Sequence, residues 1–462
     1  MDPRLTAALL AGRTATILSR RLRLGGGTTF PGSVARRFDP LAMAKMARAL
    51  PRGSVVVTGT NGKTTTSRLI SNILRTASLN PVHNRAGANL LGGVTSALIT
   101  ATTLSGRSRA DIGLFEVDEA VMPAVVREVR PKVILITNLF RDQLDRYGEV
   151  DYLAKLWRQA LAELGEDSTV VLNADDPLVA SLGEAIRPQV LYFGLEDERQ
   201  GSPTLPHAAD SKSCLHCGAR FDYSVVYYGH VGKYHCSNCG ATRPLPQVSA
   251  VDVTARGAEG NDVRLSTPTG EMFLNSSMPG LYNLYNMLAA VACCQALGIG
   301  HDHIQDGVKT FTAAFGRIER VNIDGKRVFL ALVKNPVGFG EVLRTVLADG
   351  EPKNLFIIIN DKFADGTDIS WLWDVDFELI KGRANFVLTS GIRAEDMAVR
   401  LKYAEVPVDQ IAVEKDLRAA LKKALDLTPE GDTLYVLPTY TAMLEVRDVM
   451  RQSGYVGRFW ED

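Results

Sequence analysis

Two glycines, a lysine and several hydroxyl side chains stand together early in the sequence, in the stretch GTNGKTT. An apolar run typical of a strand precedes the stretch, and a segment with helical periodicity follows it. In such a loop the glycines let backbone N–H groups converge on phosphate oxygens, the lysine adds positive charge, and a hydroxyl meets Mg²⁺. The pattern predicts a phosphate site for ATP, built from Gly59, Thr60, Asn61, Gly62, Lys63, Thr64 and Thr65.

The spacing departs from the most common phosphate-loop pattern, which has a glycine where this chain has Val57. A glycine- and threonine-rich turn that only caps a helix is the alternative interpretation. The strand before the turn, the helix after it and the GKTT core favour the phosphate loop.

Polar side chains follow the next two apolar runs. They are Glu116, Asp118 and Glu119 in FEVDEA, and Asn138, Asp142 and Asp145 after KVILIT. Open α/β sheets bind ligands at the carboxyl ends of their strands, and Mg²⁺ prefers oxygen ligands. Each carboxylate taken alone is also compatible with a solvated group or a helix cap, and Glu116 is the favoured magnesium ligand.

Four cysteines form two Cys-x-x-Cys pairs that are separated by 18 residues. They are Cys214, Cys217, Cys236 and Cys239. Two such pairs bring four thiolates together tetrahedrally, which is typical of a structural zinc site without an open coordination position. His216 and His235 are predicted to be neighbours of the site, and the segment of about 205–247 is predicted to be an inserted zinc ribbon.

The chain has 462 residues, with 52 basic and 52 acidic ones. The length predicts two or three domains, and the charge balance argues against a general nucleic-acid or membrane-surface role. No apolar run reaches the roughly 20 residues that span a bilayer, and the cysteine usage indicates a reducing compartment, so we expect a soluble cytoplasmic protein. The N-terminal stretch is interpreted as an amphipathic helix rather than a signal peptide.

Short apolar runs alternate with helical segments from Ser54 onward, which predicts an α/β fold with a parallel sheet. A turn-rich break near Gly201 leads into the cysteine cluster, and a second α/β series follows further on. We expect an N-terminal segment packed on the central domain (1–45), a central ATP-binding domain (46–314) and a C-terminal Rossmann-like domain (315–462).

Six ordered motifs resemble those of the Mur ligase superfamily: GTNGKTT, EVDE, TNLFRDQLDRYG, LNADDP, YNLYN and FGRIERV. The cysteine cluster and two later motifs, KNPVGFGEVL and NDKFADGTDISWLWDVDFE, further resemble the MurT family of lipid II isoglutaminyl synthase subunits. The resemblance covers essentially the whole chain. It implies a Mur ligase central domain and an ATP-dependent carbon–nitrogen ligase of peptidoglycan and cell-wall biosynthesis.

The resemblance also implies a reaction and a partner. Such a subunit activates the α-carboxylate of D-glutamate in lipid II as an acyl phosphate, and ammonia then attacks it to give D-isoglutamine. A class I glutaminase subunit, GatD-like, is implied to supply the ammonia within a heterodimer. The sequence is consistent with a separate glutaminase subunit, because Cys293 and Cys294 lie in an apolar helix and are predicted to be buried packing residues, not a glutaminase nucleophile. Since the phosphate loop lies so near the start of the chain, we expect no UDP-sugar domain and a lipid-linked substrate at the inner membrane face.

Individual roles follow from the same resemblance. Asn283 and Asn286 match asparagines that approach adenine, and Arg317 matches an arginine near the terminal phosphate. Thr64 and Glu116 match the residues that hold Mg²⁺, while Asn138 belongs to the nucleotide-binding set. Gln143 replaces the family's metal-binding histidine, and an amide is a weaker ligand for Mg²⁺.

The acidic motif of the C-terminal half is implied to complete the glutaminase's Cys-His site by orienting its histidine. Asp365, Asp368 and Asp374 are the candidates, and Asp368 is favoured. Asp365 also fits an ordinary turn residue.

Two other functions remain open at this point. One is a stand-alone ligase that joins an amino acid to a carboxylate, as in folate polyglutamylation. The other is a zinc-ribbon ATPase that binds nucleic acid, which needs basic and aromatic residues clustered on the ribbon. The ribbon is rich in tyrosine but has few basic residues: Lys212, Arg220, Lys233 and Arg243.

Overall fold

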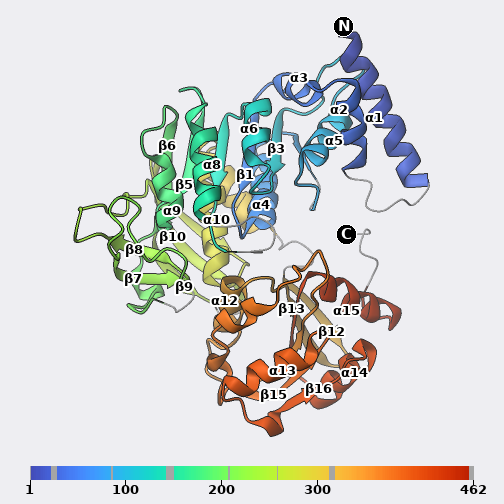
Figure 1. The fold of residues 1–462 in the computed structure, drawn as a ribbon, viewed down its shortest axis with the longest axis vertical. Coiled ribbons are helices and arrows are strands. Elements are labelled where there is room, and N and C mark those ends of the chain that lie inside the picture. Colours follow the sequence, from blue (N-terminus) through green and yellow to red (C-terminus); the bar gives the residue numbers. More distant parts are fainter. Residues whose placement is uncertain are drawn as a thin grey trace.

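The structure is a computed structural model that describes residues 2–21, 29–84, 87–141, 150–205, 209–256, 259–311 and 318–456. Figure 1 shows the N-terminal helices and the central domain in blue to yellow, with the C-terminal domain in orange and red beside them. Each of these two domains is built on its own sheet, and a separate two-stranded hairpin projects from the central domain.

The central sheet has the strand order β11-β10-β9-β6-β5-β4-β1-β3-β2. The strands are β1 Ser54–Thr58, β2 Pro81–His83, β3 Ile112–Glu116, β4 Val133–Ile136, β5 Thr169–Asn173, β6 Gln189–Leu195, β9 Val248–Ala255, β10 Asn261–Thr267 and β11 Gly270–Ser276. From β2 to β9 neighbouring strands are parallel. Every residue of β1, β3 and β4 is buried, which is why these strands are continuous apolar runs.

Strands β9, β10 and β11 pair antiparallel and form one edge of this sheet. Buried and exposed residues alternate along much of β10 and β11, as expected for strands with one solvated face. The sequence analysis expected a parallel sheet and did not find this antiparallel edge.

Helices cover both faces of the central sheet and enclose two buried cores. One face carries α4 Lys63–Thr76, α10 Leu281–Ala296 and α11 His301–Lys309. The other carries α5 Leu91–Ala101, α6 Met122–Val129 and α8 Val150–Ala162, together with the N-terminal helices α1 Pro3–Arg21, α2 Phe30–Phe38 and α3 Ala42–Arg48. The short helix α9 Pro177–Ala180 follows β5.

Between β6 and β9 the chain forms the hairpin of β7 Asp222–Tyr228 and β8 Val231–His235. Gly229 makes the turn between these strands with a φ of 53°, in the left-handed region that glycine adopts readily. The two cysteine pairs flank the hairpin. The hairpin therefore occupies the segment in which the ribbon was expected.

The C-terminal sheet has the order β12-β13-β17-β14-β15-β16. Its strands are β12 Ile318–Ile323, β13 Lys326–Ala331, β14 Lys353–Ile358, β15 Ala384–Ser390, β16 Ile411–Val413 and β17 Thr433–Pro438. Its helices are α12 Pro336–Val346, α13 Ala394–Tyr403, α14 Leu417–Leu427 and α15 Tyr440–Gln452. All pairs are parallel except β12 with β13, a hairpin whose first strand the sequence analysis missed.

Candidate active site

The phosphate loop lies between β1 and α4, as predicted. Gly59 has a φ of 128° and Gly62 a φ of 85°, both in the region that disfavours side chains. A Cβ atom on Gly62 would lie 1.9 Å from the Oδ1 atom of Asn286 on α10. Gly62 therefore allows the loop to approach α10 at backbone distance.

Lys63, the first residue of α4, folds back over the loop. Its Nζ atom donates to the carbonyl of Gly59 at 2.5 Å and to Oε1 of Glu119 at 2.5 Å. Both side chains are over nine-tenths buried. The ammonium thus sits at the loop, paired with a carboxylate that a bound phosphate group would replace.

Glu116 ends β3 and faces the start of α4. Its Oε1 atom accepts from the hydroxyl of Thr64 at 2.9 Å, whereas its buried Oε2 atom has no hydrogen-bond partner within the described part of the chain. Asn84 fixes the Glu116 backbone by two hydrogen bonds, of 2.9 and 2.8 Å. A buried oxygen without a partner beside a threonine hydroxyl fits a Mg²⁺ site, because hard cations take oxygen ligands.

Asn138 shapes the loop from the end of β4. Its Oδ1 atom accepts from the amide of Asn61 at 2.8 Å, and its Nδ2 atom donates to the Asn61 carbonyl at 3.1 Å. The Thr60 hydroxyl similarly bonds the carbonyl and the amide of Phe140, at 3.0 and 2.9 Å. These contacts use both polar groups of the Asn138 side chain, so Asn138 acts on the shape of the phosphate loop.

A narrow cleft of about 90 Å³ extends from the loop between the central and C-terminal domains. The predicted adenine residues Asn283 and Asn286, one helical turn apart on α10, line it, and Thr65 of α4 lies beside them. The cleft is also lined by residues that the sequence analysis did not select: Tyr228, Tyr282, Lys334 and Glu341.

The C-terminal domain touches the phosphate loop directly. Asn335, the N-cap of α12, donates from Nδ2 to Oδ1 of Asn61 at 3.0 Å, and Lys334 donates to the Thr60 carbonyl at 3.4 Å. A capping residue before a proline was visible in KNPVGF, but its contact partner lies more than 270 residues away. Periodicity and local spacing carry no information on such a contact.

Burial gives Glu341 an unusual protonation equilibrium. The residue is 6% exposed on α12, and its burial raises the pKa of its carboxyl to about 7, which the nearby Arg344 only partly opposes. The wall of the cleft therefore holds a carboxyl group that is largely uncharged below neutral pH.

The three candidate aspartates of the C-terminal motif have different surroundings. Asp365 is 4% exposed and accepts from the amide and the hydroxyl of Thr441, so it holds its loop against the start of α15. Asp368 and Asp374 are exposed. A hydrogen bond from the Ser370 amide, at 2.8 Å, lowers the pKa of Asp368 and orients its carboxylate.

Several predicted positions lie outside the described residues. They are Arg317 and the segment with Asp142, Gln143 and Asp145. Their roles stay predictions.

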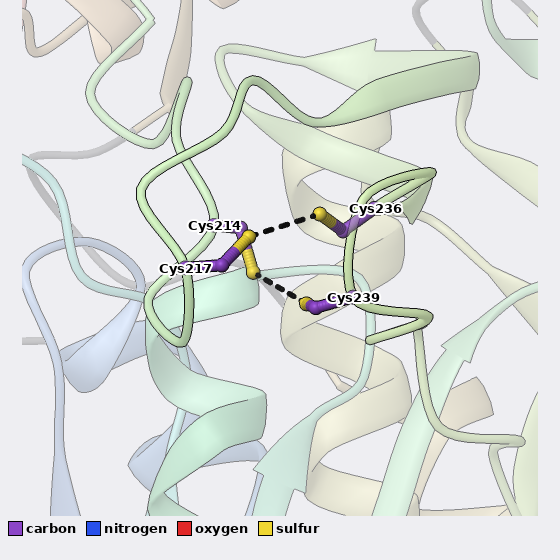
Figure 2. Close-up of side chains that lie close together, drawn as sticks. All are labelled: Cys214, Cys217, Cys236 and Cys239. Carbon is purple, nitrogen blue, oxygen red and sulfur yellow. Dashed lines mark hydrogen bonds between the residues drawn. The ribbon is translucent and has the colours of Figure 1, made fainter.

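The four cysteines of the ribbon converge, as Figure 2 shows. The Sγ atoms of Cys214 and Cys239 are 3.5 Å apart, as are those of Cys217 and Cys236, and all four lie within 4.8 Å of one another. A tetrahedral zinc site with zinc–sulfur bonds of about 2.3 Å places its sulfur atoms about 4 Å apart. The four thiols fit such an ion and leave no position for a substrate.

The ribbon hairpin packs onto the LNADDP segment, which contains the end of β5 and the residues after it. Asp175 is fully buried and is paired with Arg243 of the ribbon, and it accepts from the Tyr285 hydroxyl at 2.6 Å. Buried His230, in the hairpin turn, lies 3.3 Å from Asp176, and its ring packs on Phe140 with 4.6 Å between centroids. Because Phe140 also bonds Thr60, the ribbon and the phosphate loop share a contact residue.

In the described part of the ribbon most aromatic and basic side chains are not available to nucleic acid, although Arg220 is exposed. Tyr227, Tyr228 and Tyr234 are buried, Lys233 pairs with Glu196 and Glu198, and Arg243 pairs with Asp175 and Glu196. Stacking on bases needs exposed rings, and phosphate contacts need available cations. The arrangement favours a structural role for the ribbon.

Cys293 and Cys294 are completely buried on α10, as predicted. Burial raises the pKa of both thiols. Neither sulfur has the exposure or the thiolate character of a nucleophile.

Comparison with known proteins places the chain in a family. The Mur ligase middle domain matches residues 57–294, and the MurT ligase C-terminal domain matches residues 332–443. The chain is 33% identical over 450 residues to the MurT subunit of lipid II isoglutaminyl synthase (glutamine-hydrolyzing) of Staphylococcus aureus strain N315, covering 96% of this chain and 97% of that one. The Streptococcus pneumoniae subunit of the same name is 33% identical over 454 residues, with 97% and 98% covered.

Solved structures agree on the fold. A pseudomurein peptide ligase type C from Methanothermus fervidus superposes with a TM-score of 0.67 at 24% identity, covering 89% of this chain and 80% of that one. Mycobacterium tuberculosis folylpolyglutamate synthase, complexed with ADP, superposes with a TM-score of 0.61 at 14% identity over 89% and 92%. The matched domains and the near full-length relatives together establish that this chain belongs to the MurT family of ATP-dependent Mur ligases.

Proposed function

We propose that the chain is the ligase subunit of a glutamine-hydrolysing lipid II isoglutaminyl synthase. It uses ATP to amidate the α-carboxylate of D-glutamate in lipid II, with ammonia from a class I glutaminase partner of the GatD type. The near full-length similarity to subunits of that name supports the substrate and the need for a partner. The observation that carries the ATP-dependent step is the arrangement of Lys63, Thr64 and Glu116 around one phosphate loop.

In the proposed reaction the phosphates lie on the loop amides and at the N-terminus of α4. Lys63 leaves Glu119 for the terminal phosphate, and Thr64 and the unpartnered Oε2 of Glu116 would hold Mg²⁺. A bound Mg²⁺ neutralises the charge that develops on the transferred phosphoryl group. The substrate carboxylate attacks the γ-phosphorus and ADP leaves; ammonia then attacks the acyl carbon and phosphate leaves.

The remaining roles complete this proposal. Asn283 and Asn286, which line the cleft, are assigned to the adenine from their motif, and Arg317 is assigned to the terminal phosphate from its motif alone. Of the acidic candidates, Asp368 best suits a contact with the glutaminase, because it is exposed and oriented by Ser370, whereas buried Asp365 holds its loop against the start of α15. The four ribbon thiols are assigned to structural Zn²⁺.

The test is co-expression with the cognate class I glutaminase, followed by an assay of lipid II amidation with ATP and either glutamine or ammonium chloride. Lys63→Ala is expected to lose activity with both nitrogen sources. Asp368→Asn is expected to lose the glutamine-dependent activity and keep the ammonium-dependent one, because it affects ammonia production only. Asp374→Asn, at another exposed aspartate of the motif, is the matched comparison.

Two results would contradict the proposal. One is a purified complex that amidates no lipid II with either nitrogen source. The other is full activity in Lys63→Ala. Addition of a free amino acid to a carboxylate substrate by the isolated chain would instead support the stand-alone ligase.

A further inference from the structure

Helix α1 is apolar on two opposite faces, although it lies at the outer edge of the molecule (Figure 1). Its inner face buries Leu5, Leu9 and Ala15. A Cβ atom on Gly12 would lie 3.3 Å from Cβ of Ala35 on α2 and 2.7 Å from Cδ1 of Ile99 on α5, so the glycine lets α1 pack closely against both helices. The opposite face exposes a second apolar row. That row consists of Leu10, Ile17 and Leu18, exposed by 50, 56 and 50%, with Pro3, Ala7 and Thr14 along the same face.

The outward row has the spacing of one helix face, because residues 3, 7, 10, 14, 17 and 18 recur every three to four positions. A solvent-facing helix of a globular protein normally carries polar residues on this side. Within the described residues nothing covers the row, since its three large side chains keep about half of their surface. Contiguous exposed apolar rows mark interaction surfaces.

Arginine dominates the charged residues within α1 and α2, and the acidic residues lie at their ends: Asp2, which accepts from the amides of Arg4 and Leu5, and Asp39, which follows α2. Between Pro3 and Phe38 the sequence has no aspartate or glutamate, although the whole chain is balanced at 52 basic and 52 acidic residues. The same segment contains seven arginines: Arg4, Arg13, Arg20, Arg21, Arg23, Arg36 and Arg37. Arg36 is used in an ion pair with Glu128 and Arg13 donates to the Thr102 carbonyl, whereas Arg4 and Arg37 are exposed.

We propose that the outward face of α1 docks on the surface of an anionic lipid bilayer. An apolar helix face accompanied by arginines and without acidic residues is typical of helices that lie in the membrane interface. Each basic residue near an anionic leaflet adds electrostatic attraction, so the arginine excess favours an anionic lipid surface over a neutral protein surface. The helix lies on the membrane and does not cross it, because no described helix has the length and hydropathy of a membrane span.

The packing beneath α1 links the docked face to the candidate active site. Gly32 of α2 lies so close to α5 that a Cβ atom would meet the Gly92 carbonyl at 1.9 Å, and its amide donates to the Ser96 hydroxyl. The segment before α5 contains Asn84, which holds the backbone of Glu116. Docking would therefore orient the site toward a substrate anchored in the membrane, a consequence that rests on the function proposed above.

The experiment is flotation of the full chain, alone and with its glutaminase, with phosphatidylcholine vesicles and with vesicles that also contain phosphatidylglycerol. We expect binding to the anionic vesicles that weakens at high salt. The double variant Ile17→Ser/Leu18→Ser is expected to lower the partition coefficient at least about tenfold, because it removes two apolar side chains from the docked face. Leu245→Ser, at a residue 80% exposed beside the ribbon, is the matched control and is expected to bind like the parent.

Absence of parent binding to anionic vesicles, or unchanged binding by the double variant, would overturn the inference. A double variant that floats like the parent but loses mass in light scattering would assign the face to a second copy or to the glutaminase. Amidation of a detergent-solubilised substrate separates this inference from the proposed function. Vesicle binding without amidation contradicts only the function, and amidation without vesicle binding contradicts only the docking.

Discussion

Glu341 provides a quantitative test of the cleft. The carboxyl group is buried in α12, and its Oε1 atom lies 3.7 Å from the Nε atom of Arg344. Its burial raises the pKa from the ordinary value of 4.5 to about 7. Replacement by glutamine keeps the shape and removes the ionisation.

Proton linkage determines the direction in which the stability of the parent changes with pH. Between pH 4.5 and about 7 the folded protein holds the Glu341 proton and the unfolded chain releases it, so the free energy of unfolding falls as the pH rises through this window. The loss levels off above the folded pKa at about 3 kcal/mol. Glu341→Gln is therefore expected to match the parent at low pH and to exceed its stability by up to about 3 kcal/mol at pH 8.

Urea unfolding followed by tryptophan fluorescence in a Trp157→Phe background, which leaves Trp371, Trp373 and Trp460, measures this effect in the C-terminal domain. The exposed Glu351→Gln, in the same domain, controls for the loss of one negative charge. If the parent and Glu341→Gln lose stability in parallel between low and high pH, the carboxyl is not buried in the folded protein and the reasoning fails.

Three other substitutions test the site. Lys63→Met is expected to abolish ATP binding in equilibrium dialysis. The variant is also expected to lower the free energy of unfolding by about 3–5 kcal/mol, because it removes the ammonium group that is paired with the buried Glu119 carboxylate. Adding Glu119→Gln is expected to restore the stability but not the binding; a single variant as stable as the parent would contradict the buried pair. Gly62→Ala combines a φ of 85° with a Cβ position 1.9 Å from Asn286 Oδ1. Relief of a strain of about 1–2 kcal/mol by movement of the loop away from its phosphate-binding shape predicts an ATP affinity about five- to thirtyfold weaker by calorimetry, so an unchanged affinity would argue against this loop geometry. Cys214→Ser removes one of four converging thiols. The variant is expected to bind less zinc in elemental analysis and to have a lower melting temperature than the parent. A zinc content equal to that of the parent would exclude the four-thiol site.

Local spacing was sufficient for the phosphate loop and the cysteine cluster. The GKTT core lies between a strand and a helix, and the structure places Lys63 and Thr64 at the start of α4 as the pattern predicts. The two cysteine pairs converge because a hairpin of β7 and β8 joins them. These features depend on residues close in sequence, where side-chain type and interval already define the geometry.

The tertiary structure alone decided which distant residues complete the site. Glu119 was one of several acidic candidates until the fold paired it with Lys63, and Asn335 meets Asn61 across more than 270 residues. The outer row of α1 was interpreted as part of an ordinary amphipathic helix, because a sequence does not show which of two apolar faces a neighbour covers. Periodicity reports how a segment folds locally, whereas contacts between segments depend on how sheets and helices pack, which no local interval encodes.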